Sequence, residues 1–279
     1  MDVNRIRFNT LNAVEIKTAA IHMIVITDFG PRIAFWGRPG GENLLLWEPG
    51  KYVRKKWDLF GGHRVWVTRP LADECEETYQ EGEQANDIQE TDSGVKITTK
   101  ENPHNCTKRG IRVTVLDDNK LEVDNFLTNT GDMLYSGGVW ALTCTVPKTK
   151  TIYGIPLGED ASWDYCKIVM FKKWDGHTGG YKDDQFTFNE EMMLIVPKGK
   201  ENKRMVQADK GIIAMHDTER DILFAKKATY ERGCNYPQGC NVAVYIGPDN
   251  FMVEMETLGS EKTIKPGESI HNKETWVLE

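Results

Sequence analysis

Two carboxylates stand at alternate positions near the end of the chain, in the stretch Phe251–Thr257. If this stretch is a strand, its successive side chains point to opposite faces of the sheet. The apolar residues at odd positions then face a core, and Glu254 and Glu256 share the other face. Because charged residues are mostly exposed, we expect this pair to face water or a cleft. In a cleft they could act as general acids or bases.

A second stretch with reactive side chains is Gly61–Trp66, which reads Gly-Gly-His-Arg-Val-Trp. Two glycines let the backbone approach another segment closely. His63 can give or take a proton near neutral pH, and Arg64 can fork onto hydroxyls, a carboxylate or a phosphate. The same pattern also fits a plain turn, followed by a strand whose histidine caps a backbone group.

Aromatic residues could supply flat apolar surfaces beside these polar groups. Most of the eight tryptophans belong in the core or at its rim. A few, such as Trp66 and Trp140, could instead face a site, and this mixture of apolar faces and convergent polar groups suits a sugar ring. His177 lies in a Gly-rich loop that could cover a cleft, because binding groups favour loops.

Other kinds of site lack their patterns in this sequence. No two histidines have a metal-ligand spacing with a nearby carboxylate. The glycine-rich loops match neither a phosphate-binding nor a dinucleotide-binding pattern, and no nucleophile elbow is present. The six cysteines do not form a dense framework for a chain of this size. We therefore expect no catalytic metal, no cofactor and free thiols.

Composition and charge limit the partners of this protein. The 279 residues carry a net charge of −7, which argues against nucleic acid and anionic membranes as partners. No run of eighteen apolar residues could span a bilayer. Residues 1–5 lack an apolar signal core, so we expect a cytoplasmic location.

Short strand patterns separated by turns recur along the chain. Residues 111–128, 211–230 and 242–256 each read as a hairpin around a polar turn, and Glu274–Leu278 reads as a final strand. Consecutive hairpins without helical periods predict an antiparallel all-β protein. Because no linker rich in Pro, Gly or Ser interrupts the pattern, we predict one domain over residues 1–279.

Several short motifs follow one another in an order typical of one protein family. They are Gly30–Ile33, Asn43–Leu45, Gly61–Trp66, Leu127–Asp132, and Glu254–Thr257 followed by Pro266–Gly267–Glu268. Over roughly residues 15–278, the chain resembles galactose mutarotase-like proteins of the aldose 1-epimerase superfamily, in a bacterial branch. The resemblance implies a large, twisted antiparallel β-sandwich, or supersandwich, with a sugar site on the concave face of one sheet.

The resemblance also implies roles for individual residues. In mutarotases a glutamate takes the proton of the anomeric hydroxyl, and a histidine gives a proton to the ring oxygen. A second histidine and an arginine hold the sugar. Glu256 matches the glutamate by its Glu-Thr context, and His63 matches a histidine that follows a glycine-rich turn. Either Arg32 or Arg64 matches the sugar-holding arginine.

One position departs from the mutarotase pattern. Trp140 stands where the resemblance places the acid histidine, and tryptophan cannot transfer a proton at neutral pH. We expect Trp140 to stack on the sugar or to wall its site. The acid then comes from His63, His177 or another group, or the protein does not catalyse mutarotation. General acid catalysis is typically worth roughly 10²–10⁴-fold in rate, so its loss would leave a feeble epimerase.

Three functions remain open at this point. The first is a carbohydrate-binding protein that acts as an aldose 1-epimerase with an altered acid. The second is a glycoside hydrolase or a polysaccharide lyase-related enzyme that uses Glu254 and Glu256. A hydrolase needs carboxyl groups across the scissile bond, whereas two neighbours on one strand lie on the same side of a sugar. The third is a sugar-binding module without turnover. In each case the expected partner is a sugar or a short carbohydrate.

Overall fold

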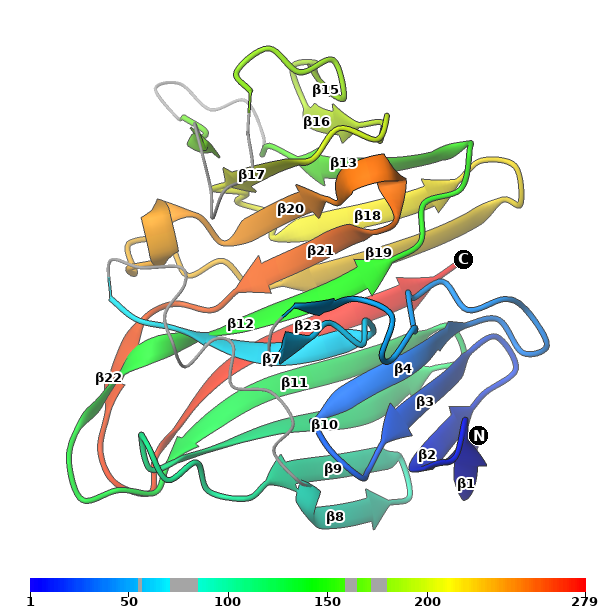
Figure 1. Cartoon of the computed structure of the whole chain (residues 1–279). Coiled ribbons are helices and arrows are strands. Elements are labelled where there is room, and N and C mark those ends of the chain that lie inside the picture. Colours follow the sequence, from blue (N-terminus) through cyan, green and yellow to red (C-terminus); the bar gives the residue numbers. More distant parts are fainter. Residues whose placement is uncertain (55–56, 71–84, 159–164, 172–179) are drawn as a thin grey trace.

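The computed structural model describes residues 1–54, 57–70, 85–158, 165–171 and 180–279. These residues form β-strands and two short 3₁₀ turns, η1 (Pro237–Gly239) and η2 (Pro248–Asn250), without an α-helix. In the same residues, no helix is long and apolar enough to cross a bilayer. Two large antiparallel sheets pack face to face (Figure 1), which confirms the predicted all-β sandwich.

The first large sheet, called sheet 1 here, has eleven strands with β7, β12 and β21 near its middle. In hydrogen-bonded order its strands are β1 (Asp2–Phe8), β2 (Leu11–Lys17), β3 (His22–Ile26), β4 (Arg32–Gly37), β7 (His63–Thr68), β12 (Tyr135–Thr145), β21 (Val253–Leu258), β20 (Val242–Ile246), β17 (Asn202–Val206) and β14 (Ile168–Met170), while β22 (Lys262–Ile264) pairs with one end of β12.

The second large sheet, sheet 2, has ten strands and contains the final strand. In order they are β15 (Phe186–Phe188), β16 (Met192–Ile195), β13 (Thr151–Pro156), β18 (Ile212–Asp217), β19 (Ile222–Ala228), β23 (Ser269–Leu278), β11 (Lys120–Asn129), β10 (Thr107–Asp117), β9 (Gly94–Thr99) and β8 (Ala85–Thr91). A separate pair consists of β5 (Val53–Arg54) and β6 (Trp57–Asp58). The predicted hairpins are confirmed as β10–β11, β18–β19 and β20–β21.

Side-chain alternation gives sheet 1 two different faces. The face toward sheet 2, called the inner face, carries Val65, Val139 and Met255, which join the main hydrophobic core of the two sheets. The opposite face, called the outer face, carries a separate apolar cluster that includes Trp66 and Trp140. Burial on both faces explains why the middle strands are almost free of exposed residues.

A cluster of polar side chains lies buried between the two sheets. Lys226 Nζ lies 2.8 Å from Glu274 Oε1 and donates to Thr143 Oγ1 at 2.7 Å. The two ring nitrogens of His63 lie 2.8 Å from Thr143 Oγ1 and 2.8 Å from Asn125 Oδ1. Burial lowers the pKa of His63 to about 4, so its ring is neutral at neutral pH. These groups stabilise one another inside an otherwise apolar core.

The glycine pair before β7 brings a long connection against sheet 1. Gly61 and Gly62 have φ of 90° and 72°, values that L side chains rarely adopt. A Cβ on Gly61 would lie 2.2 Å from the Leu46 carbonyl oxygen, and one on Gly62 would lie 2.3 Å from that of Ile33. Only glycine fits both constraints. The connection that contains Leu46 therefore packs onto the outer face beside Cys144.

Candidate functional site

A cluster of polar and aromatic side chains occupies the middle of the outer face of sheet 1. The strand register brings its members together, because Leu142 on β12 pairs with Arg64 on one side and with Glu256 on the other. We call this group the outer-face cluster; it consists of Arg64, Trp66, Trp140, Cys144, Lys203, Glu254 and Glu256. All seven are buried. Such a concentration of ionisable groups is typical of a functional site.

Glu256 is a fully buried carboxyl group of the outer-face cluster. Trp140 Nε1 donates a hydrogen bond of 2.9 Å to Glu256 Oε2, and Lys203 Nζ lies 3.8 Å from the same oxygen. The other oxygen, Oε1, has no hydrogen-bond partner among the described residues. Burial raises the pKa of Glu256 to about 7, against the opposing effect of Lys203. This carboxyl group can therefore exchange a proton near neutral pH.

Glu254, two residues earlier on the same strand, is held in an ion pair. Its Oε1 accepts a hydrogen bond of 2.8 Å from Arg64 Nη2. The Arg64 guanidinium also lies 3.1 Å from Cys144 Sγ and 4.3 Å from the ring centroid of Trp66. A buried and paired carboxylate is costly to disturb. The two glutamates therefore differ in their hydrogen bonds. Glu254 is paired with Arg64, whereas Oε1 of Glu256 accepts no hydrogen bond within the described residues.

Lys203 reaches Glu256 from a strand two positions away in the sheet. On the intervening strand β20, Ala243 pairs with Glu256, and Tyr245 pairs with Lys203. The ammonium of Lys203 lies 4.4 Å from the ring centroid of Trp140, close enough for a cation–π contact. Lys203 is thus placed between the carboxylate and the indole.

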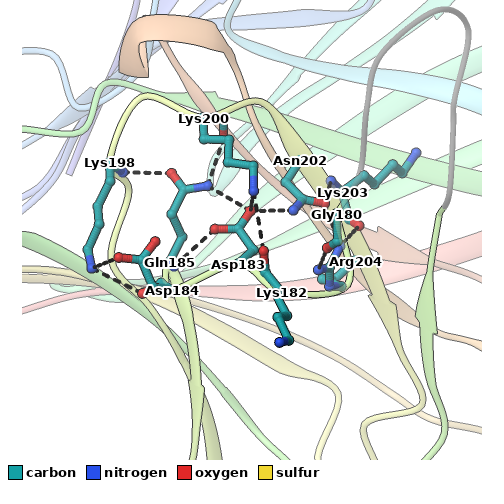
Figure 2. A network of polar contacts seen from close by, with 10 residues as sticks. All are labelled: Gly180, Lys182, Asp183, Asp184, Gln185, Lys198, Lys200, Asn202, Lys203 and Arg204. Atoms are coloured by element: carbon teal, nitrogen blue, oxygen red, sulfur yellow. Dashed lines mark hydrogen bonds and ion pairs between the residues drawn. The ribbon is translucent and has the colours of Figure 1, made fainter.

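A second polar network holds the strand that carries Lys203 (Figure 2). The neighbouring side chains Asn202 and Arg204 bond to the segment before β15: Asn202 Nδ2 donates to Asp183 Oδ2, and Arg204 Nη2 donates to the Gly180 carbonyl at 2.6 Å. In Figure 2 the side chain of Lys203 runs away from Asp183. The network therefore fixes β17 with Lys203 directed to the other face.

The structure brings four of the seven predicted site residues into one cluster: Arg64, Trp140, Glu254 and Glu256. Arg32 pairs with Arg64 in the strand register, but its Nη1 donates to the Gly61 carbonyl at 2.6 Å. Arg32 thus supports the glycine turn. His177 lies outside the described residues.

The resemblance implies that His63 acts beside Glu256, but the structure places these two side chains on opposite faces of sheet 1. His63 faces inward, where its ring lies 5.0 Å from that of Trp276 on sheet 2. The physical reason is the alternation of side chains along a strand. His63 and Arg64 are consecutive residues of β7, and only Arg64 shares a face with Glu256.

The two carboxylates are also less accessible than we expected. Glu254 and Glu256 are 5% and 0% exposed, so neither faces open water. The connection around Leu46 and Leu59 packs with Cys144 and Tyr245 on the same face of the sheet. A sugar can therefore reach Glu256 only if some of the side chains that cover the outer face move.

No group of three metal-ligating side chains comes together within the part of the chain that the structure describes. The five described cysteines carry free thiols. Burial raises the pKa of Cys144 to about 12, which keeps this thiol protonated. The chemistry of the outer-face cluster thus rests on carboxylate, ammonium and guanidinium groups.

Several solved structures resemble this chain over nearly its whole length. A proposed aldose 1-epimerase from Escherichia coli K12 is 11% identical with a TM-score of 0.65, covering 95% of this chain and 98% of its own. A galactose mutarotase-related enzyme from Lactobacillus acidophilus is 10% identical with a TM-score of 0.64. The match covers 96% of this chain and 97% of that enzyme. A galactose mutarotase-like protein from Clostridium acetobutylicum is 11% identical with a TM-score of 0.63. The match covers 100% of this chain and 98% of that protein.

These likenesses show that the chain has the galactose mutarotase-like fold, as predicted. By sequence, no family model and no curated protein matches the chain. Identities near one residue in ten reveal the fold and leave the chemistry to be argued from the site itself.

Proposed function

We propose that this protein binds a sugar on the outer face of sheet 1 and interconverts the anomers of an aldose, with Glu256 as the proton acceptor. The observation that carries the proposal is the state of Glu256. It is a buried carboxyl group whose pKa is raised to about 7, and its Oε1 accepts no hydrogen bond within the described residues. A base whose pKa lies near the working pH is well matched to taking a proton from a hydroxyl group.

The surroundings of Glu256 also suit a sugar. Trp66 and Trp140 lie edge to face with their ring centroids 5.5 Å apart, and they give the outer face an apolar wall. Arg64 and Lys203 place a guanidinium and an ammonium group against these rings. Sugar sites combine such apolar and convergent polar groups. Since the indole N–H of Trp140 is engaged by Glu256, this residue serves as a wall that also orients the base.

Glycoside hydrolysis has weaker support from the site. Its two carboxyl groups must flank the scissile bond, but Glu254 and Glu256 project from the same face of β21. Glu254 is in addition held by Arg64 at 2.8 Å. A binding module without turnover is distinguished from the proposed epimerase by activity alone.

The experiment is polarimetry of freshly dissolved aldoses, with sugar binding followed in parallel by calorimetry. We expect the parent protein to accelerate mutarotation of at least one aldose. Glu256→Gln keeps the side-chain shape but removes the base, so it should lose roughly 10²–10⁴-fold in rate and still bind the sugar. Glu122→Gln, a partly exposed carboxyl on sheet 2, is the matched control.

Two results would overturn the proposal. If Glu256→Gln kept the full rate of the parent, Glu256 would not be the base. If the parent bound a sugar but accelerated the mutarotation of no aldose, the protein would be a binding module.

A further inference from the structure

We infer that Lys203 gives the proton to the ring oxygen of the sugar, an inference that rests on the proposed function. Opening a pyranose requires a base at the anomeric hydroxyl and an acid at the ring oxygen, and one carbon bears both oxygens. The donor must therefore lie close beside Glu256. Lys203 Nζ is 3.8 Å from Glu256 Oε2 and belongs to the same buried cluster. Two groups at this separation can each contact one of two oxygens on the same carbon.

The other candidate donors near Glu256 are unsuited by their chemistry or by their position. Burial raises the pKa of Cys144 to about 12. Burial also raises the pKa of Tyr245, whose hydroxyl donates to Glu201. A guanidinium such as that of Arg64 does not release its proton in proteins. His63 faces the other side of the sheet. Among the described side chains near Glu256, Lys203 is therefore the best-placed donor.

The structure also explains how a flexible lysine keeps one position. The hydrogen bonds of Asn202 and Arg204 hold β17, which lies between β20 and β14 in sheet 1 (Figure 2). The indole of Trp140 lies 4.4 Å from the Lys203 ammonium, close enough for a cation–π contact. Preorganisation of this kind is what a proton donor needs, because it avoids reordering during the reaction.

The reaction step balances with these two groups alone. The Glu256 carboxylate takes the proton of the anomeric hydroxyl, and the electron pair of that O–H bond becomes the second bond of the C1 carbonyl. The bond between C1 and the ring oxygen breaks, and the ring oxygen takes the electron pair and a proton from the Lys203 ammonium. After rotation about C1–C2, the lysine amine takes this proton back as the oxygen attacks C1. Protonated Glu256 then returns its proton to the carbonyl oxygen.

The test compares Lys203→Arg, Lys203→Ala and Glu256→Gln by polarimetry and calorimetry, with Lys198→Arg as an exposed-lysine control. Arginine keeps the charge but does not release a proton, so Lys203→Arg should lose roughly 10²–10⁴-fold in kcat while sugar affinity changes far less. In Lys203→Ala, added methylammonium should restore part of the rate. Tetramethylammonium, a cation with no proton to give, should not.

The outcomes separate this inference from the proposed function. If Lys203→Arg kept the parent kcat while Glu256→Gln lost it, Lys203 would not be the donor and the epimerase proposal would stand. Equal rescue of Lys203→Ala by the two cations would show that Lys203 acts only through its charge, and would also overturn the inference. If Glu256→Gln kept the parent rate, the proposed function itself would fail.

Discussion

The indole N–H of Trp140 donates a 2.9 Å hydrogen bond to Oε2 of Glu256, joining neighbouring strands of one sheet. Trp140 stands at the position where the resemblance to mutarotases places an acid histidine. An indole cannot act as that acid, but its N–H stabilises the ionised form of the carboxyl group beside it. We infer that this position tunes the base, and that the acid comes from elsewhere in the cluster.

Trp140→Phe should raise the pKa of Glu256 further. The substitution removes the N–H donor and keeps an aromatic ring. A hydrogen bond to a charged group is worth about 1.5–3 kcal/mol, which corresponds to a shift of about one to two pH units. The acid limb of kcat/KM against pH should move upward by that amount. Trp36→Phe, an indole on the inner face, is the control and should leave the limb in place. An unmoved limb in Trp140→Phe would contradict the role given to this bond.

Glu256 should make the folded protein less stable as the pH rises. Burial raises its pKa from 4.5 to about 7, so between these values the folded state binds more protons than the unfolded state. Its contribution to the free energy of unfolding is complete below about pH 4.5 and is lost as the pH rises through about 7. The size is on the order of 3 kcal/mol. Between pH 5 and pH 8, denaturant titrations should show the parent losing this stability relative to Glu256→Gln, and an equal change in both proteins would refute it.

His63 should make the folded protein less stable as the pH falls. Burial lowers its pKa from 6.5 to about 4, so the folded state binds fewer protons than the unfolded state in this range. Its contribution is present above about pH 6.5 and is lost as the pH falls toward 4. The loss at pH 4 relative to pH 7 should shrink in His63→Gln. Exposed His104→Gln is the control and should behave as the parent does. An undiminished loss in His63→Gln would show that His63 is not buried in its neutral form.

The buried ion pair of the outer face should contribute far more to stability than an exposed pair. Arg64→Met leaves the Glu254 carboxylate buried without its guanidinium partner. The expected cost is about 3–5 kcal/mol in the free energy of unfolding. The exposed pair Arg5–Glu90 is the control, since Glu90→Gln should cost about 1 kcal/mol or less. Similar costs for the two variants would mean that Glu254 is solvated in solution.

Much of the fold follows from local sequence patterns. The alternation in Phe251–Thr257 correctly placed Val253 and Met255 in the core and Glu254 and Glu256 on the opposite face. The turn residues located the hairpins. These features are local, because the period of a strand and the chemistry of a turn depend on neighbouring residues.

Three features of the site were not predicted from the sequence: the burial of the two carboxyl groups, the inward position of His63 and the place of Lys203. The burial of Glu254 and Glu256 depends on side chains from strands that are distant in the sequence, such as Trp140 and Lys203, which no local pattern predicts. The sequence does predict that His63 and Arg64 lie on opposite faces of the sheet, since consecutive strand residues face opposite ways. Lys203 was missed because its importance comes from the register of β17, β20 and β21, which pairs residues far apart in the sequence.

A crystal structure of Glu256→Gln with a bound aldose would show directly where the sugar lies. The substitution blocks the proton transfer, so a bound pyranose keeps its closed ring. We predict that the anomeric oxygen lies within about 2.6–3.2 Å of the residue 256 amide and that the ring oxygen lies within the same distance of Lys203 Nζ. The apolar face of the ring should lie against Trp140. A sugar ordered at another surface, with the outer-face cluster closed as it is here, would contradict the account.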